Sequence, residues 1–406
     1  MASLSMDVIL APSTPGGRVC ASSCEISVAG FFCHRATSVG IKIIFNPLAD
    51  DGKSPESSTF LNMNEKYVLC IPRGCGFNDL LCQISEAHGF ALKTGRTLLI
   101  DTRLSGLADS LSNYFELVEP DDKIILGLEP DGLRRLNRLS CFPREYEGRI
   151  DWIYHRFMAV DTLKSRKWPC FNSILRMARI LMYVIQNEEL DTISRKTGFV
   201  ADYLKAGRKH RPIEFEKLEG HPADLIVHHM SGGGEGSMGT LGILRFKRET
   251  ARDIDLRIRF LGSDYDAVHI RNTDYKSDFK TFLERIEPKL SGRRILLCTD
   301  DSGVISVARE TLSRSEIVVV EKSFPSDGMR GRPLHHQWRS SKESIRRNNT
   351  DMFAELVGMS KARNLYYPTL IENIHKASVS GFSTLAQNLR SRLGILDRLM
   401  MYVNEV

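Results

Sequence analysis

The chain has 406 residues, which is more than one ordinary hydrophobic core accommodates and indicates two domains. A hydrophobic content of 42% and a charged content of 26% are typical of a soluble globular protein. The net charge of +6 is modest and no stretch is densely basic, so nucleic acid is not expected as a partner. Individual arginines placed for phosphate groups fit the same charge equally well.

Membrane insertion and disulfide scaffolding are also not expected. No apolar run approaches the ~20 residues that span a bilayer, so we expect no transmembrane segment. The nine cysteines are odd in number and form no Cys-x-x-Cys pair, which indicates neither a disulfide framework nor a zinc site. Reduced thiols in a cytoplasmic protein follow from this usage.

Residues 1–62 differ in composition from the rest, being rich in Ser, Gly, Pro and Ala. They contain no basic start followed by a sustained apolar core, so a secretory signal is not expected. We expect an unstructured extension or a start assigned too far upstream, because Met63 lies just before the first convincing strand. A Ser-rich targeting segment is the alternative.

The first regular unit begins with a buried strand over residues 67–71, which Pro72 ends. A glycine-containing turn over 73–79 leads into a helix over about 80–93, and 97–101 is the next strand. The glycine spacing matches neither a dinucleotide fingerprint nor a Walker loop. The turn therefore either brings backbone N–H groups to an anionic or sugar ligand, or is simply a packed turn.

The middle of the chain continues with a strand over 123–126, an apolar core helix over 173–189 and a strand over 223–229. The glycine-rich stretch 231–237 follows and is interpreted as a hinge or surface loop, with a phosphate-binding loop as the alternative. We place the domain boundary there, which gives domains 63–235 and 236–406.

The last 170 or so residues form a second strand–helix–strand crossover. The fold class that follows is α/β, with a parallel sheet in each of two units. The expected elements are a long helix over 241–260, strands over 266–271 and 294–301 around a helix over 278–290, a helix over 304–312, a strand over 316–320, a polar loop over 325–338, a helix over 351–363, a short strand over 365–367 and a final helix from 381.

Polar residues at the carboxyl ends of the two central strands mark the expected site: His269, Arg271 and Asp300. Ligands of open parallel sheets bind at that end of the strands. Each has a plainer interpretation as well: a buried histidine bonded to a carbonyl, a surface cation, and an acid beside Asp301, itself a candidate helix N-cap. Asp300 and Asp301 point opposite ways on a strand, which argues against a metal site.

In their order along the chain, these motifs resemble the bacterial nodulation fucosyltransferases, and more distantly the α1,6-fucosyltransferases and protein O-fucosyltransferases. The likeness covers about residues 65–395, and the middle, 105–260, matches weakly. The residues that carry it are Gly76-Phe77-Asn78-Asp79, Thr94-Gly95-Arg96-Thr97-Leu98, Asp101-Thr102-Arg103, Val268-His269-Ile270-Arg271, Cys298-Thr299-Asp300, Gly331-Arg332-Pro333-Leu334-His335, Glu355 and Phe382-Ser383-Thr384.

The resemblance implies a two-domain GT-B glycosyltransferase, with two Rossmann-like domains facing a cleft, that uses GDP-fucose and needs no metal or other cofactor. It implies transfer to O6 of an N-acetylglucosamine-ended oligosaccharide such as a chitooligosaccharide. The implied donor-binding residues are His269 and Arg271 at the diphosphate, Asp300 and Glu355 at the ribose or guanine, Ser383 or Thr384 at phosphate, and Gly76 and Phe77 in the cleft.

Two further features belong to this interpretation. Direct inverting displacement requires a general base, for which Asp274 and Asp278 are the candidates beyond Arg271; Asp278 is equally a helix cap. Arg330, Arg332 and His335 lie on a loop that either closes over the donor or is merely solvated.

The chain also departs from the family at Asn272, where a second basic residue is common, and in a longer segment between Tyr367 and Phe382. Asn272 keeps open a catalytically inert glycan- or nucleotide-binding relative. A transferase for another nucleotide sugar and a transferase for a protein acceptor are equally compatible with these motifs.

Overall fold

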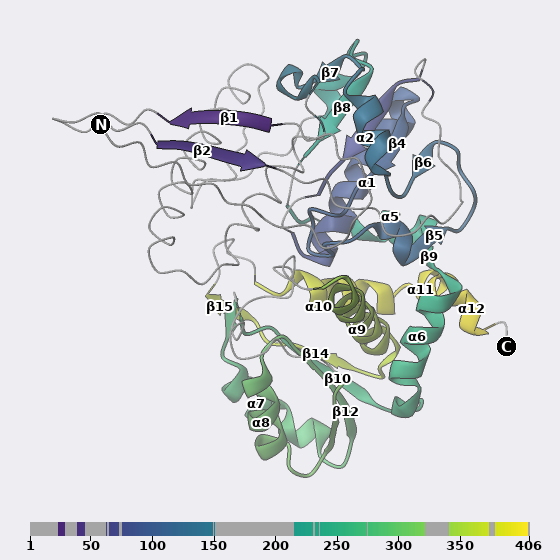
Figure 1. Cartoon of the computed structure of the whole chain (residues 1–406). Coiled ribbons are helices and arrows are strands. Elements are labelled where there is room, and N and C mark those ends of the chain that lie inside the picture. Colours follow the sequence, from purple (N-terminus) through teal and green to yellow (C-terminus); the bar gives the residue numbers. More distant parts are fainter. Residues whose placement is uncertain are drawn as a thin grey trace, which may run out of the picture. The chain divides into compact units, whose positions relative to one another are not determined.

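The computed structural model divides the chain into two compact units, residues 1–58 and 59–406. In the shorter unit, β1 (Ser23–Val28) pairs antiparallel with β2 (Val39–Ile44), within the stretch for which the sequence suggests an unstructured extension. The expected helix over 173–189 and the polar loop over 325–338 lie outside the described residues. Besides those two strands, the described residues are 62, 65–72, 75–148, 150, 215–229, 232–234, 236–273, 275–320, 341–372 and 378–404 (Figure 1).

The first sheet of the longer unit is parallel throughout, with strand order β6-β4-β3-β8-β7. Its three central strands, β3, β4 and β8, are wholly buried, which is why they are continuous apolar runs in the sequence. The strands are β3 (Tyr67–Cys70), β4 (Thr97–Ile100), β6 (Ile124–Ile125), β7 (Cys141–Phe142) and β8 (Leu225–His228).

Both faces of the first sheet are covered by helices. Alternate residues point to opposite faces of a strand, so Val68 packs with α1 (Phe77–Thr94) on one side. Leu69 packs on the other side with α2 (Pro130–Leu136). Helix α1 ends at Gly95, whose φ of 66° is the left-handed conformation that closes a helix.

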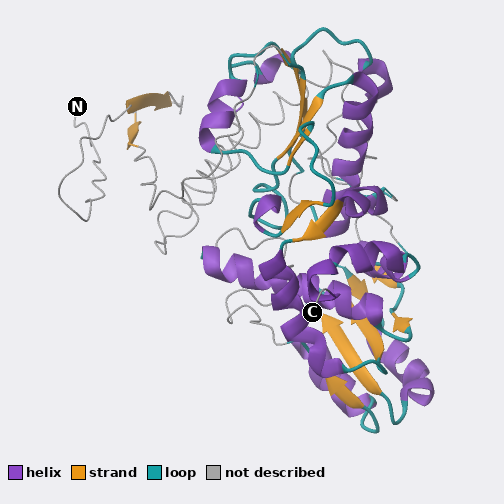
Figure 2. Ribbon diagram, turned by 90° about the vertical axis from the view of Figure 1, so that its right-hand side faces the viewer, coloured by secondary structure: helices purple, strands orange, loops and turns teal. Residues whose placement is uncertain are grey.

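The second sheet is also parallel, in the order β13-β12-β10-β14, and Figure 2 shows helices along it. One face packs on α7 and α8, and the other on α9 and α10. The elements are β10 (Asp266–Ile270), α7 (Phe279–Leu290), β12 (Arg294–Thr299), α8 (Ser302–Thr311), β13 (Glu316–Val318), α9 (Lys342–Lys361), β14 (Leu365–Tyr366) and α10 (Gly381–Arg390), with the small ribbon of β11 (Lys276–Ser277) and β15 (Leu370–Glu372) beside them.

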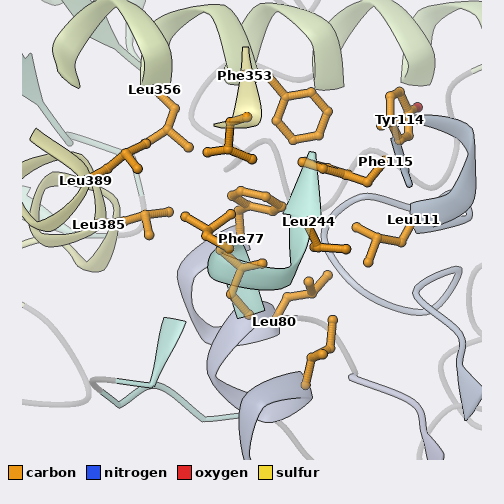
Figure 3. Close-up of a cluster of buried hydrophobic side chains, with 14 of the residues drawn as sticks. Phe77, Leu80, Leu111, Tyr114, Phe115, Leu244, Phe353, Leu356, Leu385 and Leu389 are labelled. Atoms are coloured by element: carbon orange, nitrogen blue, oxygen red, sulfur yellow. The ribbon is translucent and has the colours of Figure 1, made fainter. Parts of the chain in front are cut away.

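One hydrophobic core joins the helices of the two sheets (Figure 3). Phe77 at the start of α1 meets Phe353 of α9 edge to face, with ring centroids 5.3 Å apart. Phe115 contacts the same Phe353 ring at 5.2 Å. A buried polar tie lies beside these rings, because Asn349 Nδ2 donates to Leu107 O at 2.9 Å. The fold is therefore mixed α/β with parallel sheets, as the sequence predicts.

The single long helix predicted over 241–260 is wrong. A strand interrupts it, and that strand pairs antiparallel with β5 (Phe115–Leu117), far earlier in the chain. Phe246 stacks on Phe115 with centroids 4.6 Å apart, so burial against a distant strand overrides the local helical pattern. The stretch consists of α5 (Ser237–Ile243), β9 (Leu244–Phe246) and α6 (Arg248–Ile258).

The end of the chain also differs from expectation, because α10 is not the final helix. Two short helices follow it, α11 (Leu393–Leu399) and α12 (Met401–Asn404). The boundary between domains stays a prediction, although α5 and β9 lie beyond it and pack on α1 and β5. In the described part of the chain, no helix combines the length and apolar character that crossing a bilayer requires.

Candidate functional site

The residues singled out from the sequence gather at the carboxyl edges of the two parallel sheets. In the first sheet, β3 leads to Gly76 and α1, while β8 leads to the glycines 232–234. In the second sheet, β10 leads to Arg271 and β12 leads to Asp300. This is the edge at which open α/β sheets bind ligands.

The two edges meet where α1 and α10 begin. A Cβ added to Gly381 would lie 3.3 Å from Asn78 Nδ2, so the first turns of the two helices are in contact. Neither helix has a side-chain hydrogen bond capping its start. The N-terminal N–H groups of a helix attract anions, but Asp79 already faces those of α1, whereas the first turn of α10 has no acid. An anion is therefore better accommodated at α10.

His269 and Ser383 are brought together, as their shared assignment to the donor requires. His269 Nδ1 lies 2.6 Å from Ser383 Oγ, and the two residues are 7% and 1% exposed. The neighbouring Phe382 ring is 5.6 Å from the imidazole. Thr384 Oγ1 donates to Ser380 O within the first turn of α10, at 3.3 Å. The pair thus fixes the start of α10 on the end of β10.

Arg271 follows β10 and keeps 19% of its side chain exposed. Its Nε lies 3.8 Å from Asp300 Oδ2, and its guanidinium carbon lies 5.1 Å from the centre of the Tyr275 ring. A carboxylate on one side and an aromatic face on another restrict the orientation of the guanidinium. Arg271 is therefore next to an acid, but it is not enclosed by it.

Asp300 organises the turn after β10. Its Oδ1 accepts from the backbone N of Asn272 at 2.8 Å, and its Oδ2 accepts from Thr273 Oγ1 at 2.5 Å. Each carboxylate oxygen has two lone pairs, so the predicted bond to a nucleotide would be an additional one.

The side chain of Asn272 is bonded to the protein. Its Nδ2 donates to Asp301 Oδ2 at 2.7 Å, while Asp301 Oδ1 accepts from Gly303 N at 2.9 Å and caps α8. The interpretation of Asp301 as a helix N-cap is confirmed. Asn272 therefore ties the turn after β10 to α8, and its donor contact stays a prediction.

Three further candidates lie at different depths. Gly76 is the N-cap residue of α1. The Phe77 ring is 6% exposed and belongs to the core, so a contact with a donor would have to come from its backbone. Glu355 is buried on α9, with 4% exposure. The donor-binding roles of all three stay predictions.

The candidates for a general base are separated by the structure. Asp278 is exposed and caps α7, its carboxylate accepting from Thr281 N at 3.4 Å. Asp274 lies outside the described residues, and so does His335. The choice between the two aspartates stays a prediction.

The glycine-rich stretch is neither a hinge nor a free loop over residues 232–234, because α1 holds it. Gln83 Nε2 donates to Gly232 O at 2.9 Å, and Cys82 Sγ lies 3.2 Å from Gly234 O. A Cβ on Gly233 would come within 2.7 Å of Asp79 Oδ1, so only a glycine fits there without displacing that carboxylate.

A buried histidine completes this attachment. His228, at the end of β8, is fully buried, and its Nε2 lies 2.9 Å from Gln83 Oε1. The amide oxygen can only accept, so His228 Nε2 donates. Burial lowers the pKa of His228 to about 3, since no solvent stabilises the charged imidazole.

This histidine predicts a pH dependence of stability. Between pH 6.5 and about 3 the unfolded chain binds a proton at His228 that the folded protein does not bind, so stability is lost as pH falls through this window. The loss from this group is about 1.4 kcal/mol per pH unit. In urea unfolding at pH 7 and pH 5, His228→Gln is expected to lose about 2 kcal/mol less than the wild type. Equal losses in the two proteins would contradict this.

Two residues near the meeting point received no role from the sequence, Asn78 and Asp79. The signal was present, because an amide and an acid open the helix directly after a glycine turn. That pattern is also the ordinary one for a helix start, so it carried no weight alone.

Comparison with known proteins returns structural neighbours only. No protein-family model matches the sequence, and no curated protein sequence matches it. The solved structures that are similar include NodZ α-1,6-fucosyltransferase soaked with GDP-fucose and fucosyltransferase NodZ from Bradyrhizobium. Each is 17% identical over 80% of this chain and 92% of its own, with a TM-score of 0.45. A mutant of FUT1 from Arabidopsis thaliana in complex with GDP is 12% identical over 80% of this chain and 69% of its own, with a TM-score of 0.39.

Proposed function

We propose that this chain is a glycosyltransferase that moves fucose from GDP-fucose to O6 of an N-acetylglucosamine-ended oligosaccharide. The observation that carries the proposal is the arrangement at the carboxyl edge of the second sheet. There the oriented Arg271 and the His269–Ser383 pair lie at a helix start without an acid. These are the residues in which the sequence resembles the fucosyltransferases.

The chemistry asks for a group that stabilises the departing diphosphate. As the bond from the fucose carbon to the phosphate oxygen breaks, negative charge grows on GDP. The guanidinium of Arg271 suits this charge, because its N–H donors grip two phosphate oxygens and stay charged at any working pH. The N–H groups at the start of α10 add favourable dipoles on the same side.

The proposal includes the finer architecture and mechanism. The two parallel sheets would belong to two Rossmann-like domains of GT-B type, with the donor in a cleft between them. Transfer would be inverting and independent of a metal, since a guanidinium takes the part that a cation has elsewhere. We also propose a cytoplasmic location, supported by the free thiols of the five cysteines that the structure describes.

A second candidate is a catalytically inert relative that binds the nucleotide or glycan. The observation in its favour is Asn272, whose side chain is bonded to Asp301 and supplies no charge at the strand end. A single nearby cation would neutralise a diphosphate less completely than two.

Calorimetry with GDP, UDP and ADP tests the donor. We expect GDP to bind most tightly, with the same affinity in EDTA as with added magnesium. Slow release of fucose from GDP-fucose without acceptor separates an enzyme from an inert binder. Equal affinity for the three nucleotides would contradict the proposed donor, and binding without any turnover would favour the inert relative.

A further inference from the structure

The start of α1 combines a carboxylate and an amide that the proposed donor site leaves unused. Asp79 lies in the first turn of α1, and Asn78 precedes it. Asn78 is only 9% exposed, yet its one hydrogen bond with a described residue is a long one, from Nδ2 to Asp79 Oδ1 at 3.5 Å. Its amide oxygen accepts no hydrogen bond from any residue that the structure describes. Buried amides are almost always satisfied, so this exception points to a polar ligand.

The Asn78 side chain is also directed at the proposed donor site. The atoms nearest to a Cβ built on Gly381 are Asn78 Nδ2 at 3.3 Å and Asn78 Cβ at 3.6 Å. Gly381 opens α10, whose Ser383 is bonded to His269. The Asn78–Asp79 pair and the diphosphate site therefore lie on either side of one helical turn, with an axial rise of about 1.5 Å per residue.

The chain around Asp79 leaves room for that carboxylate and nothing larger. A Cβ at Gly233 would come 2.7 Å from Asp79 Oδ1, whereas a Cβ at the next glycine, Gly234, would meet only Cys82 Cβ at 4.0 Å. Hydrogen bonds from α1 hold the backbone on both sides of Gly233 in place. The glycine stretch thus approaches α1 most closely at the charged side chain of Asp79.

The thiols near this carboxylate add no charge of their own. Burial raises the pKa of Cys75, just before the N-cap of α1, and burial also raises the pKa of Cys82, one turn further on. Both stay protonated at neutral pH. A carboxylate beside neutral groups and an unsatisfied amide suits a sugar hydroxyl better than a phosphate.

From this we infer that Asp79 is the general base of the proposed transfer reaction and that Asn78 binds the acceptor hydroxyl beside it. The inference rests on the proposed function and replaces neither Arg271 nor the donor site. The acceptor hydroxyl gives its proton to Asp79 as its oxygen forms the bond to the fucose carbon. The bond from that carbon to the phosphate oxygen breaks, and its electron pair leaves with GDP beside Arg271. Asp79 then returns the proton to water.

Asp79→Asn is the direct test, since it keeps the size of the side chain and removes the base. With GDP-fucose and a chitooligosaccharide, we expect kcat to fall by about 10²–10⁴-fold, with GDP affinity unchanged. The wild-type rate should decline at acid pH as one carboxylate protonates, and this limb should be absent from the residual activity of the variant. A merely structural role would lower stability without removing the limb.

Gly233→Ala and Gly234→Ala form a matched pair. The first adds a methyl group against Asp79 Oδ1 and is expected to displace the carboxylate and lower kcat, while the second adds one in ordinary contact distance and should leave kcat near wild type. Wild-type transfer with an unaffected Asp79→Asn, or an acid limb lost only in Asp278→Asn, would overturn the assignment of Asp79 alone. GDP-fucose left intact by the wild-type protein with this acceptor would overturn the proposed function together with it.

Discussion

Replacing Arg271 by alanine is expected to lower the rate of fucosyl transfer by about 10²–10³-fold, because a preorganised donor at the developing charge is lost. The fold should remain intact. Asp300, which faces Arg271, keeps its bonds from Asn272 N and Thr273 Oγ1 in the variant. The measurements are kcat with GDP-fucose and the melting temperature.

Arg294→Ala is the matched control for this prediction. Arg294 begins β12 at the opposite edge of the same sheet, where its guanidinium pairs with Glu316 in solvent. We expect its turnover and melting temperature to stay close to wild type. If Arg271→Ala also retained its turnover, the leaving-group role would belong to another residue.

Removing Arg96 should have the largest effect on stability. The guanidinium is 4% exposed at the amino edge of the first sheet. It donates to His221 O at 2.7 Å and Ala223 O at 2.9 Å, with longer contacts to Tyr67 O and Asp224 O. Hydrogen bonds from a charged group contribute about 1.5–3 kcal/mol each, so Arg96→Ala is expected to cost about 3–5 kcal/mol.

Urea denaturation measures this loss, and Arg96→Lys provides the comparison. Lysine keeps the charge but has no planar fork to reach carbonyls on two sides, so its stability should lie between those of alanine and wild type. A loss below about 1 kcal/mol in Arg96→Ala would mean that water satisfies the carbonyls without the arginine.

The central strands could be predicted from the sequence because buried parallel strands are short, continuous apolar runs. The helices were found less completely. Helix α9 begins nine residues before the predicted Asp351, at a cap where Ser341 accepts from Ser344 N, and its polar first turns show no apolar periodicity. The strand β9 was missed because its pairing partner lies more than a hundred residues away.

The position of the candidate site could be predicted because topology assigns ligands to the carboxyl edge of a parallel sheet. Its internal contacts could not. That Asp300 binds the turn after β10, or that Asn272 is bonded to Asp301, depends on where a second strand and a second helix lie in space. The closeness of Asn78 to Gly381 joins residues about 300 positions apart, which no local pattern reports.

The core that joins the two sheets has a consequence for synthesis of the chain. Phe115 and Phe77 are buried partly by Phe353, which the ribosome adds roughly 240 residues after Phe115, some tens of seconds later at ordinary rates. During that interval the nascent protein carries an uncovered aromatic surface. We therefore expect chaperones to raise the yield of the intact chain far more than that of a protein whose halves mature in succession.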